Sequence, residues 1–266
     1  MRRVGLGYRA SLHDWIVENE ETIDCLEITA EHFFDRGQKT LAALSERFPI
    51  FVHGLGLSLG TPGPMDRETL KQFARVAKTA KAEWVSEHVA FTRTAEVDLG
   101  HLNPVPMTRE SLSVMVEHAQ EVSEFCQLPL ILENITFDLN IGGELAEVDF
   151  LNQLCDQAQC GLLLDVTNLF INSKNHHFDA TAWLQEIQPH YIKQLHIVGY
   201  SKIGDTFHDH HAATIQPDLL DLLRTVLDYC AVEAIILERD EKLEAANEIG
   251  DEIQKLHTIA ADARLD

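Results

Sequence analysis

Residues 161–166 read GLLLDV, an apolar run that ends on the carboxylate of Asp165. Aliphatic residues at successive positions are typical of a strand that buries both of its faces in a parallel sheet. An ionisable group at the end of such a strand loses its hydration unless a partner compensates for its charge. The run therefore predicts a parallel sheet and a partner of opposite charge for Asp165, and a multivalent cation would meet that need.

Five other short apolar runs also carry a metal-capable side chain at or near their ends. These runs are FVHG, SEHVA, LILEN, QLHIV and IILER, and the side chains belong to His53, His88, Glu133, His196 and Glu238. Taken alone, each residue is better explained as a hydrogen-bonded core histidine or as an acid that caps the next helix. Repetition over six runs favours a shared metal site instead.

Strand-like runs alternate with helical patterns along the whole chain. The runs lie near residues 4–7, 25–28, 50–53, 84–89, 129–133, 161–166, 191–198 and 233–238. Asp66, Thr108 and Asp179 precede helical patterns as expected N-caps. Eight repeats without a linker or low-complexity tract predict an α/β fold, a single (β/α)8 TIM barrel over residues 1–266, rather than a doubly wound sheet. The six metal-capable residues are then expected at the C-terminal mouth of that barrel.

Composition excludes some classes of partner. The 266 residues are 45% hydrophobic, and 43 acidic residues against 21 Lys and Arg give a formal charge of -22. This charge opposes binding to nucleic acid and to anionic membranes. Most of the acids are expected to be solvated on helices such as one over residues 241–256. Because the sequence has neither an apolar run that could span a bilayer nor a signal-peptide core, it predicts a cytoplasmic protein.

Two further segments offer metal ligands. Asn168 follows Asp165 by three residues and could supply an amide oxygen, although a turn or cap role is equally open. Residues 205–211 are rich in Asp and His and are expected to form a loop that has little hydrophobic reason to be ordered, so that a metal could order it. Asp209 and His211 have the spacing that turns two side chains to the same side of an extended segment. The other members of the segment are Asp205, His208 and His210, and for these two histidines a solvated loop is the preferred interpretation.

The types of ligand limit the metal. Imidazole and carboxylate without thiolate suit non-haem iron, manganese or zinc, and the number of candidates exceeds what one ion can use, which predicts two or three ions. The five cysteines are odd in number and form no CxxC pair, so reduced and mostly buried thiols are expected. The glycine-rich stretch over residues 53–64 lacks the P-loop pattern. Its glycines are expected to let the backbone bend closely beside the metals.

Several longer motifs resemble one known family, the multinuclear non-haem iron-dependent oxidative enzymes. These motifs are HGLGLSLG (53–60), SEHVAFT (86–92), NPVPMT (103–108), LENITFD (132–138), LLLDVTNLFINSKNH (162–176), LHIVGY (195–200) followed by Asp-x-His, and ILERD (236–240). They cover nearly the whole chain. The resemblance implies a barrel similar to that of xylose isomerase. It also implies enzymes that use a mixed-valence Fe(II)/Fe(III) pair and dioxygen to modify cysteines of ribosomally made peptides.

The resemblance also implies roles for individual residues. Those matching His53 and His88 bind one iron, and Glu133 bridges it to the next. Asp165, His196 and Glu238 complete the second, redox-active position, and Glu133, Asp165 and His196 would be catalytic. The third, sometimes labile iron would be held by Asn168, Asp209 and His211. The partners implied are a cysteine-containing precursor peptide and a separate protein that binds its leader.

Departures from the family pattern leave alternatives open. His32 in EHFF replaces the usual Asn, and the segment around His208 carries extra histidine, which puts the substrate contacts there in doubt.

Similar ligand sets serve divalent-metal hydrolases and sugar isomerases on the same barrel, related to endonuclease IV or xylose isomerase. A third possibility is a non-enzymatic metal-binding scaffold. Metal content and dependence on oxygen distinguish these three classes.

Overall fold

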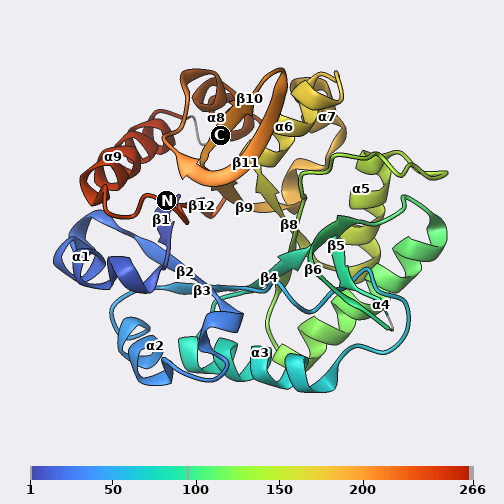
Figure 1. The fold of residues 1–266 in the computed structure, drawn as a ribbon, viewed down its shortest axis with the longest axis horizontal. Coiled ribbons are helices and arrows are strands. Elements are labelled where there is room, and N and C mark those ends of the chain that lie inside the picture. The colour runs from blue at the N-terminus through green and yellow to red at the C-terminus, as the bar shows by residue number, and fades with distance from the viewer. Residues whose placement is uncertain (1, 95, 264–266) are drawn as a thin grey trace. The chain divides into compact units, whose positions relative to one another are not determined.

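The computed structural model describes residues 2–94 and 96–263, and it contains a closed barrel of eight parallel strands. The strand order around the barrel is β1, β12, β9, β8, β7, β4, β3, β2 (Figure 1). The strands are β1 (Arg3–Gly7), β2 (Cys25–Thr29), β3 (Ile50–His53), β4 (Val85–His88), β7 (Leu130–Glu133), β8 (Gly161–Asp165), β9 (Ile192–Ile197) and β12 (Ala234–Leu237). All eight expected strands are present, and the predicted (β/α)8 barrel is confirmed.

The chain divides by its internal contacts into two compact units. One unit is Ile28–Leu162, and the other combines the residues up to Glu27 with those from Leu163 onward. In the first unit, β4 pairs in parallel with β3 and β7. The register places His88 opposite Glu133, so two predicted ligands lie on adjacent strands at the same C-terminal level.

The second unit contains the ladder of β1, β12 and β9. Ile236 pairs with His196, which places the end of β12 beside His196 at the end of β9. The aliphatic residues of these strands are almost completely buried, as expected for strands that bury both faces. His196 itself is fully buried. Its imidazole must therefore find its polar partners inside the protein.

The described helices follow the predicted pattern. They are α1 (His13–Glu18), α2 (Gln38–Leu44), α3 (Arg67–Ala80), α4 (Arg109–Cys126), α5 (Glu147–Ala158), α6 (Val166–Asn175), α7 (Ala180–Glu186), α8 (Pro217–Tyr229) and α9 (Ala246–Asp262). The three expected N-caps are confirmed, because Asp66, Thr108 and Asp179 each accept a hydrogen bond from a backbone amide of the helix that follows. None of the helices within residues 2–94 and 96–263 is long and apolar enough to cross a membrane.

Two hairpins were not anticipated from the sequence. They are β5 (Ala90–Arg93) with β6 (Asp98–Pro104), and β10 (Gly199–Ile203) with β11 (Thr206–Ala213). The expectation of a loop at residues 205–211 is therefore wrong, since most of that segment is strand. Phe207 packs against the rings of Phe170 and Tyr200, at centroid distances of 6.0 and 5.2 Å, and this packing gives the hairpin a hydrophobic reason to be ordered.

The helix expected over residues 241–256 begins later, at Ala246. The backbone amides of Asp240 and Glu241 are instead hydrogen-bonded to the carbonyl of His211, which holds this stretch against β11. Glu252 also differs from the expected solvated acid. It is 2% exposed and pairs with the buried Arg239 at 2.9 Å, so its charge is compensated inside the fold.

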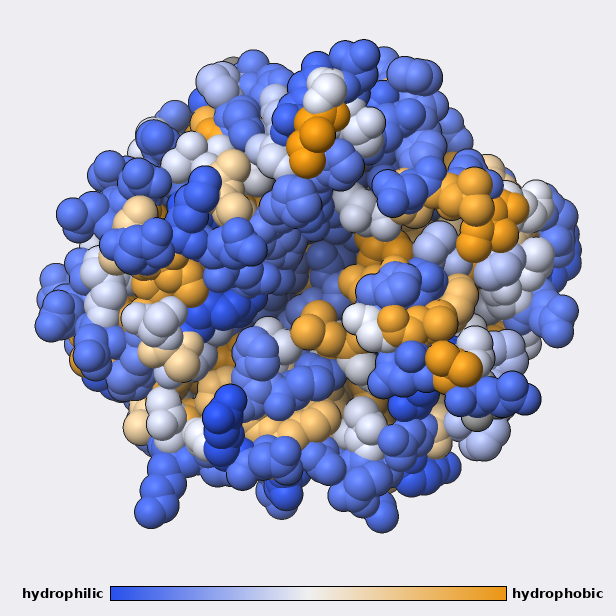
Figure 2. Space-filling model, in the orientation of Figure 1, coloured by the Kyte–Doolittle hydropathy of each residue, from blue (hydrophilic) through white to orange (hydrophobic). Residues whose placement is uncertain are grey.

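Hydrophilic residues cover most of the face shown in Figure 2, and hydrophobic residues lie between them in small separate groups. This distribution fits the high content of acidic residues. The five thiols are free, as expected. Cys25, Cys155 and Cys230 are buried, whereas Cys126 and Cys160 are partly exposed.

Candidate metal centre

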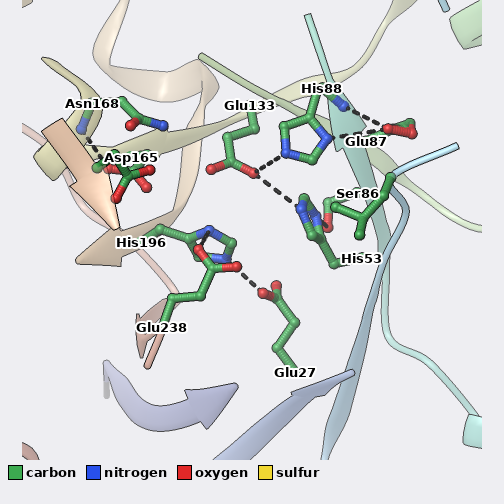
Figure 3. Close-up of polar contacts among 12 residues, drawn as sticks. Glu27, His53, Ser86, Glu87, His88, Glu133, Asp165, Asn168, His196 and Glu238 are labelled. Carbon is green, nitrogen blue, oxygen red and sulfur yellow. Dashed lines mark hydrogen bonds and ion pairs between the residues drawn. The ribbon is translucent and has the colours of Figure 1, made fainter. Parts of the chain in front are cut away.

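The first ligand group lies within the unit Ile28–Leu162 and consists of His53, His88 and Glu133. Each is the last residue of its strand and each is buried, with 2 to 6% of its surface exposed. The Nε2 atoms of His53 and His88 lie 3.2 and 3.3 Å from the same oxygen, Oε2 of Glu133 (Figure 3). Ligand atoms of all three residues fall within 4.8 Å of one another. The ends of the three strands thus bring two imidazoles to one carboxylate.

Neighbouring side chains fix the orientation of both imidazoles. Nδ1 of His53 is 2.8 Å from Oγ of Ser86, and Nδ1 of His88 is 3.2 Å from Oε1 of Glu87. Burial raises the pKa of Glu87 to about 7, although its hydrogen bond with His88 opposes the rise. When Nδ1 carries the proton in such a contact, the lone pair is left on Nε2, which is the atom that would bind a metal.

The residue after His53 is Gly54, and its close surroundings explain why a glycine occupies this position. A Cβ atom there would lie 2.8 Å from the ring of Phe73 and 3.2 Å from Glu87. A larger residue would therefore push the chain away from the side chain that orients His88. Gly54 therefore permits a close approach of the backbone to Phe73 and Glu87, whereas a close approach to metals stays a prediction.

The second ligand group lies in the other unit and consists of Asp165, His196 and Glu238. Ligand atoms of these residues also fall within 4.8 Å of one another. Nδ1 of His196 is 3.0 Å from Oε2 of Glu238. Asp165 serves in addition as the N-cap of α6, because its Oδ1 accepts a hydrogen bond of 2.7 Å from the amide of Asn168. Asp165 therefore does cap a helix, as its simpler interpretation predicted. The cap uses one of its two carboxylate oxygens.

Glu27 is a residue that the sequence reasoning missed. It lies in the middle of β2, is 3% exposed, and its Oε1 is 2.6 Å from Nε2 of His196 (Figure 3). Its second oxygen accepts a hydrogen bond of 2.5 Å from Gln194. Because a carboxylate only accepts, a neutral His196 would carry its proton on Nε2, facing Glu27, and would present the Nδ1 lone pair to Glu238. The available signal was an acid inside the otherwise apolar run that opens with Cys25.

The third predicted group is partly assembled. Oδ2 of Asp209 is 2.8 Å from Nε2 of His211, so these two side chains do share one side of β11, as their spacing predicted. Nδ1 of His211 is 3.3 Å from Asp240 and 3.8 Å from Glu238, which links this pair to the second group. The structure places Asn168 beside Asp165 through its backbone amide. The two extra histidines of the segment, His208 and His210, have stacked rings 5.7 Å apart.

The charge around His211 is strongly negative. Burial lowers the pKa of His211, but the carboxylates of Glu238, Asp209 and Asp240 outweigh this effect and raise it to about 12. Oδ1 of Asp209 is buried and has no hydrogen-bond partner among the residues that the structure describes. Arg9 ion-pairs with Asp240. The three carboxylates around His211 therefore stabilise positive charge at this position.

A family model described as "RiPP precursor modification enzyme MbnB/TglH/ChrH" matches residues 3–261. The chain belongs to this family. The resemblance to the multinuclear non-haem iron-dependent oxidative enzymes is thereby confirmed. Relatives of the family at 30% identity or more include a UPF0276 protein of Shewanella sediminis (strain HAW-EB3), 34% identical over 96% of this chain and 93% of that protein. Another is the UPF0276 protein PA14_21580 of Pseudomonas aeruginosa (strain UCBPP-PA14), 30% identical over 98% of this chain and 94% of that protein.

Solved structures similar to this member of the MbnB/TglH/ChrH family are xylose-isomerase-like barrels. D-psicose 3-epimerase matches with a TM-score of 0.63 and 13% identity, covering 98% of this chain and 99% of that one. Endonuclease IV from Thermus thermophilus matches with a TM-score of 0.62 and 15% identity, covering 98% and 100%. At these identities the likeness establishes the fold. The family match indicates an enzyme.

The donor atoms fit a divalent or trivalent metal. In the first group, two imidazole nitrogens and a carboxylate oxygen meet without a thiolate, a set typical of non-haem iron, manganese or zinc. In the second group, a lone pair on Nδ1 of His196 would face the Glu238 carboxylate at 3.0 Å, so a proton or a metal ion must separate them. The unpartnered oxygen of Asp209 adds a buried anionic donor. These features support metal use by this member of the family.

Glu27 gives a direct test of how His196 is positioned. In a Glu27→Gln variant, the new amide would donate to Nε2 and move the imidazole proton to Nδ1, where it blocks the ligand lone pair. We expect the variant's affinity for divalent metal to fall by about 10- to 100-fold, the usual effect of losing such a supporting contact. Calorimetric titration with zinc measures this change. Glu18→Gln, at an exposed position, is the matched control, and equal affinities in the two variants would show that Glu27 has only a structural role.

Proposed function

We propose that the protein is an iron- and dioxygen-dependent oxidase that modifies cysteine residues of a ribosomally synthesised precursor peptide. The observation that carries the proposal is the group of His53, His88 and Glu133, two oriented imidazoles facing one buried carboxylate in a chain of a precursor-modifying family. Neutral imidazole and carboxylate ligands suit iron, and they leave positions open for a substrate thiolate.

We assign the ligands to two or three iron ions. His53 and His88 would hold the first, and Asp165, His196 and Glu238 the second. Glu133, the last residue of β7, would bridge the two. This division of the ligands is what the resemblance to the family implies, and the family match over residues 3–261 supports it. A third ion would use Asn168, Asp209 and His211.

The protein's own residues would prepare the chemistry. When bound, an Fe(II)/Fe(III) pair supplies one-electron oxidation by dioxygen and lowers the pKa of a cysteine thiol that binds to it. Burial of His53, His88 and Glu133 excludes bulk water from their ligand atoms. Glu27 would hold the proton of a neutral His196 on Nε2. We name Glu133, Asp165 and His196 as the catalytic residues, because the resemblance to the family implies that the residues at these positions would hold the redox-active ion.

The proposed partners are peptidic. A cysteine-containing precursor peptide is the substrate that the family description supports. We further propose a separate partner protein that binds the leader segment, as the resemblance to this family implies. The five free thiols fit a reducing, cytoplasmic location.

A second candidate is a divalent-metal hydrolase or sugar isomerase. The fold favours it, since solved neighbours include an epimerase and an endonuclease. The formal charge of -22 argues against a nucleic-acid substrate. The third class, a metal-binding scaffold without catalysis, would bind iron but consume no oxygen.

Oxygen uptake distinguishes these functions. The protein would be loaded anaerobically with ferrous iron or with zinc, and dioxygen consumption followed with a cysteine peptide and with its serine counterpart. We expect dioxygen consumption only when the iron-loaded protein is mixed with the cysteine peptide, and not with the serine peptide or with zinc. Turnover of a sugar or phosphodiester by the zinc-loaded protein, independent of oxygen, would support the hydrolase or isomerase instead.

A further inference from the structure

Helix α3 carries a stripe of basic residues in a strongly acidic protein. Within residues 67–81 there are five basic side chains and a single acidic one, Glu68. Lys71, Arg75 and Lys78 follow one another at intervals of four and three residues, which places them on one side of the helix, and all three are exposed. A local excess of positive charge on a chain of net charge -22 is a candidate recognition surface.

The stripe borders a groove between α3 and α4, which lie side by side within one unit (Figure 1). The groove has a volume of about 580 Å3. Apolar atoms dominate its lining, and Phe125, with 41% of its surface exposed, lies in it. The remaining lining residues are Lys71, Ala74, Arg75, Ala77, Lys78, Lys81, Ala82, Cys126, Gln127 and Leu128. The groove therefore combines an apolar floor with a basic rim.

Structural roles account for only part of the rim. Lys81 ion-pairs with Glu46 at 2.6 Å, and Arg75 donates to the carbonyl of Phe34. Lys78 lies in the last turn of α3, where a cation complements the helix dipole. Neither Lys71 nor Lys78 has an ion-pair partner within residues 2–94 and 96–263. Two cations beside an exposed aromatic ring are thus available to an anionic ligand.

The groove lies away from His53, His88 and Glu133, the ligand group of its own unit. Its lining includes Lys81 and Gln127, the C-caps of α3 and α4, whereas these ligands lie at the C-terminal ends of their strands, toward which the helices present their N-termini. Helix α3 has 14 residues, which corresponds to about 21 Å at about 1.5 Å per residue. An extended chain of roughly six or seven residues would bridge that length. The occupant of the groove is therefore a segment other than the one that reacts.

We propose that the α3–α4 groove docks an acidic, amphipathic segment of the precursor peptide that is distant in sequence from the modified cysteine and lies outside the leader bound by the partner protein; this identity of the occupant rests on the proposed function. Carboxylates of the segment pair with Lys71 and Lys78, and a leucine or phenylalanine packs on Phe125. Because the net negative charge of the protein disfavours binding of an acidic segment elsewhere, the groove also fixes where the segment binds. Docking here raises the effective concentration of the attached cysteine at the strand ends.

Fluorescence anisotropy tests the groove with the protein as purified. The probes are short labelled peptides rich in glutamate with one leucine or phenylalanine, and the same peptides with glutamine in place of glutamate. We expect binding of the acidic peptides to weaken with salt, and to weaken by about tenfold in the double variant K71E/K78E, since attraction is replaced by repulsion at two sites. The control K193E/K255E makes the same change in net charge at exposed positions elsewhere. Phe125→Ser, compared with Ile203→Ser, tests the apolar contact.

Equal affinity of K71E/K78E and K193E/K255E for the acidic peptides would overturn the proposal, as would failure of the acidic peptides to bind the unmodified protein. The outcome is separable from that of the proposed function. Oxygen uptake with a short cysteine peptide that lacks an acidic segment should be the same in K71E/K78E and in the unmodified protein. Absence of uptake in both would contradict the oxidase, while groove binding would be judged from anisotropy alone.

Discussion

Glu133→Gln is expected to lower cysteine-dependent oxygen uptake by more than about 100-fold, since loss of a supporting contact alone costs about 10- to 100-fold and Glu133 is a proposed ligand. Its Oε2 faces Nε2 of both His53 and His88, at 3.2 and 3.3 Å. Glutamine keeps the size of the side chain but removes the negative charge that would bridge two cations. Iron content measured by mass spectrometry should fall together with activity.

A matched control separates this effect from a general loss of charge. Glu124→Gln removes one carboxylate from an exposed position of α4 and should leave both iron content and oxygen uptake unchanged. The thermal transition of metal-free Glu133→Gln should not be lower than that of the unmodified metal-free protein, because the change relieves a buried charge. Full iron content and normal uptake in Glu133→Gln would remove this residue from the centre.

Asp165→Asn is the second large effect, and it separates two roles of one side chain. Asparagine retains an oxygen that can accept the 2.7 Å hydrogen bond from Asn168, so the N-cap of α6 should survive. The negative charge needed for the second metal position is lost. We expect oxygen uptake to fall by more than about 100-fold, whereas the free energy of unfolding should change by less than about 0.5 kcal/mol.

Asp165→Ala provides the comparison. It removes the cap as well as the charge and should destabilise the protein by about 1 kcal/mol in urea unfolding, with the same loss of oxygen uptake. If Asp165→Asn retained full activity while Asp165→Ala lost stability, Asp165 would be a helix cap and nothing more. The pair of variants therefore decides between the functional and the structural interpretation.

The barrel was predictable because its signals are local. Each strand is a short aliphatic run, and the caps at Asp66, Thr108 and Asp179 act within a few residues of themselves. The β10–β11 hairpin was not predictable in this way. Its order depends on packing of Phe207 against Phe170, which belongs to α6 and lies far back in the sequence.

The candidate site shows the same division. His53, His88 and Glu133 could be named from their places at strand ends, and the register of β4 with β7 follows once the barrel is known. Glu27 could not, because its partner His196 comes from a strand that is distant in sequence. Glu252 was misjudged for a similar reason. Its sequence context is that of a solvated acid on a helix. Its burial is explained by an ion pair with Arg239, which follows β12 and is close to Glu252 only in the folded protein.

The number and identity of metal ions per chain test the central claim most directly. Protein produced with iron available and purified without oxygen would be measured by mass spectrometry and Mössbauer spectroscopy. We predict two or three irons per chain, with a coupled Fe(II)/Fe(III) pair that disappears in Glu133→Gln. A single ion per chain, or a stoichiometric complement of zinc with oxygen-independent turnover, would contradict the assignment.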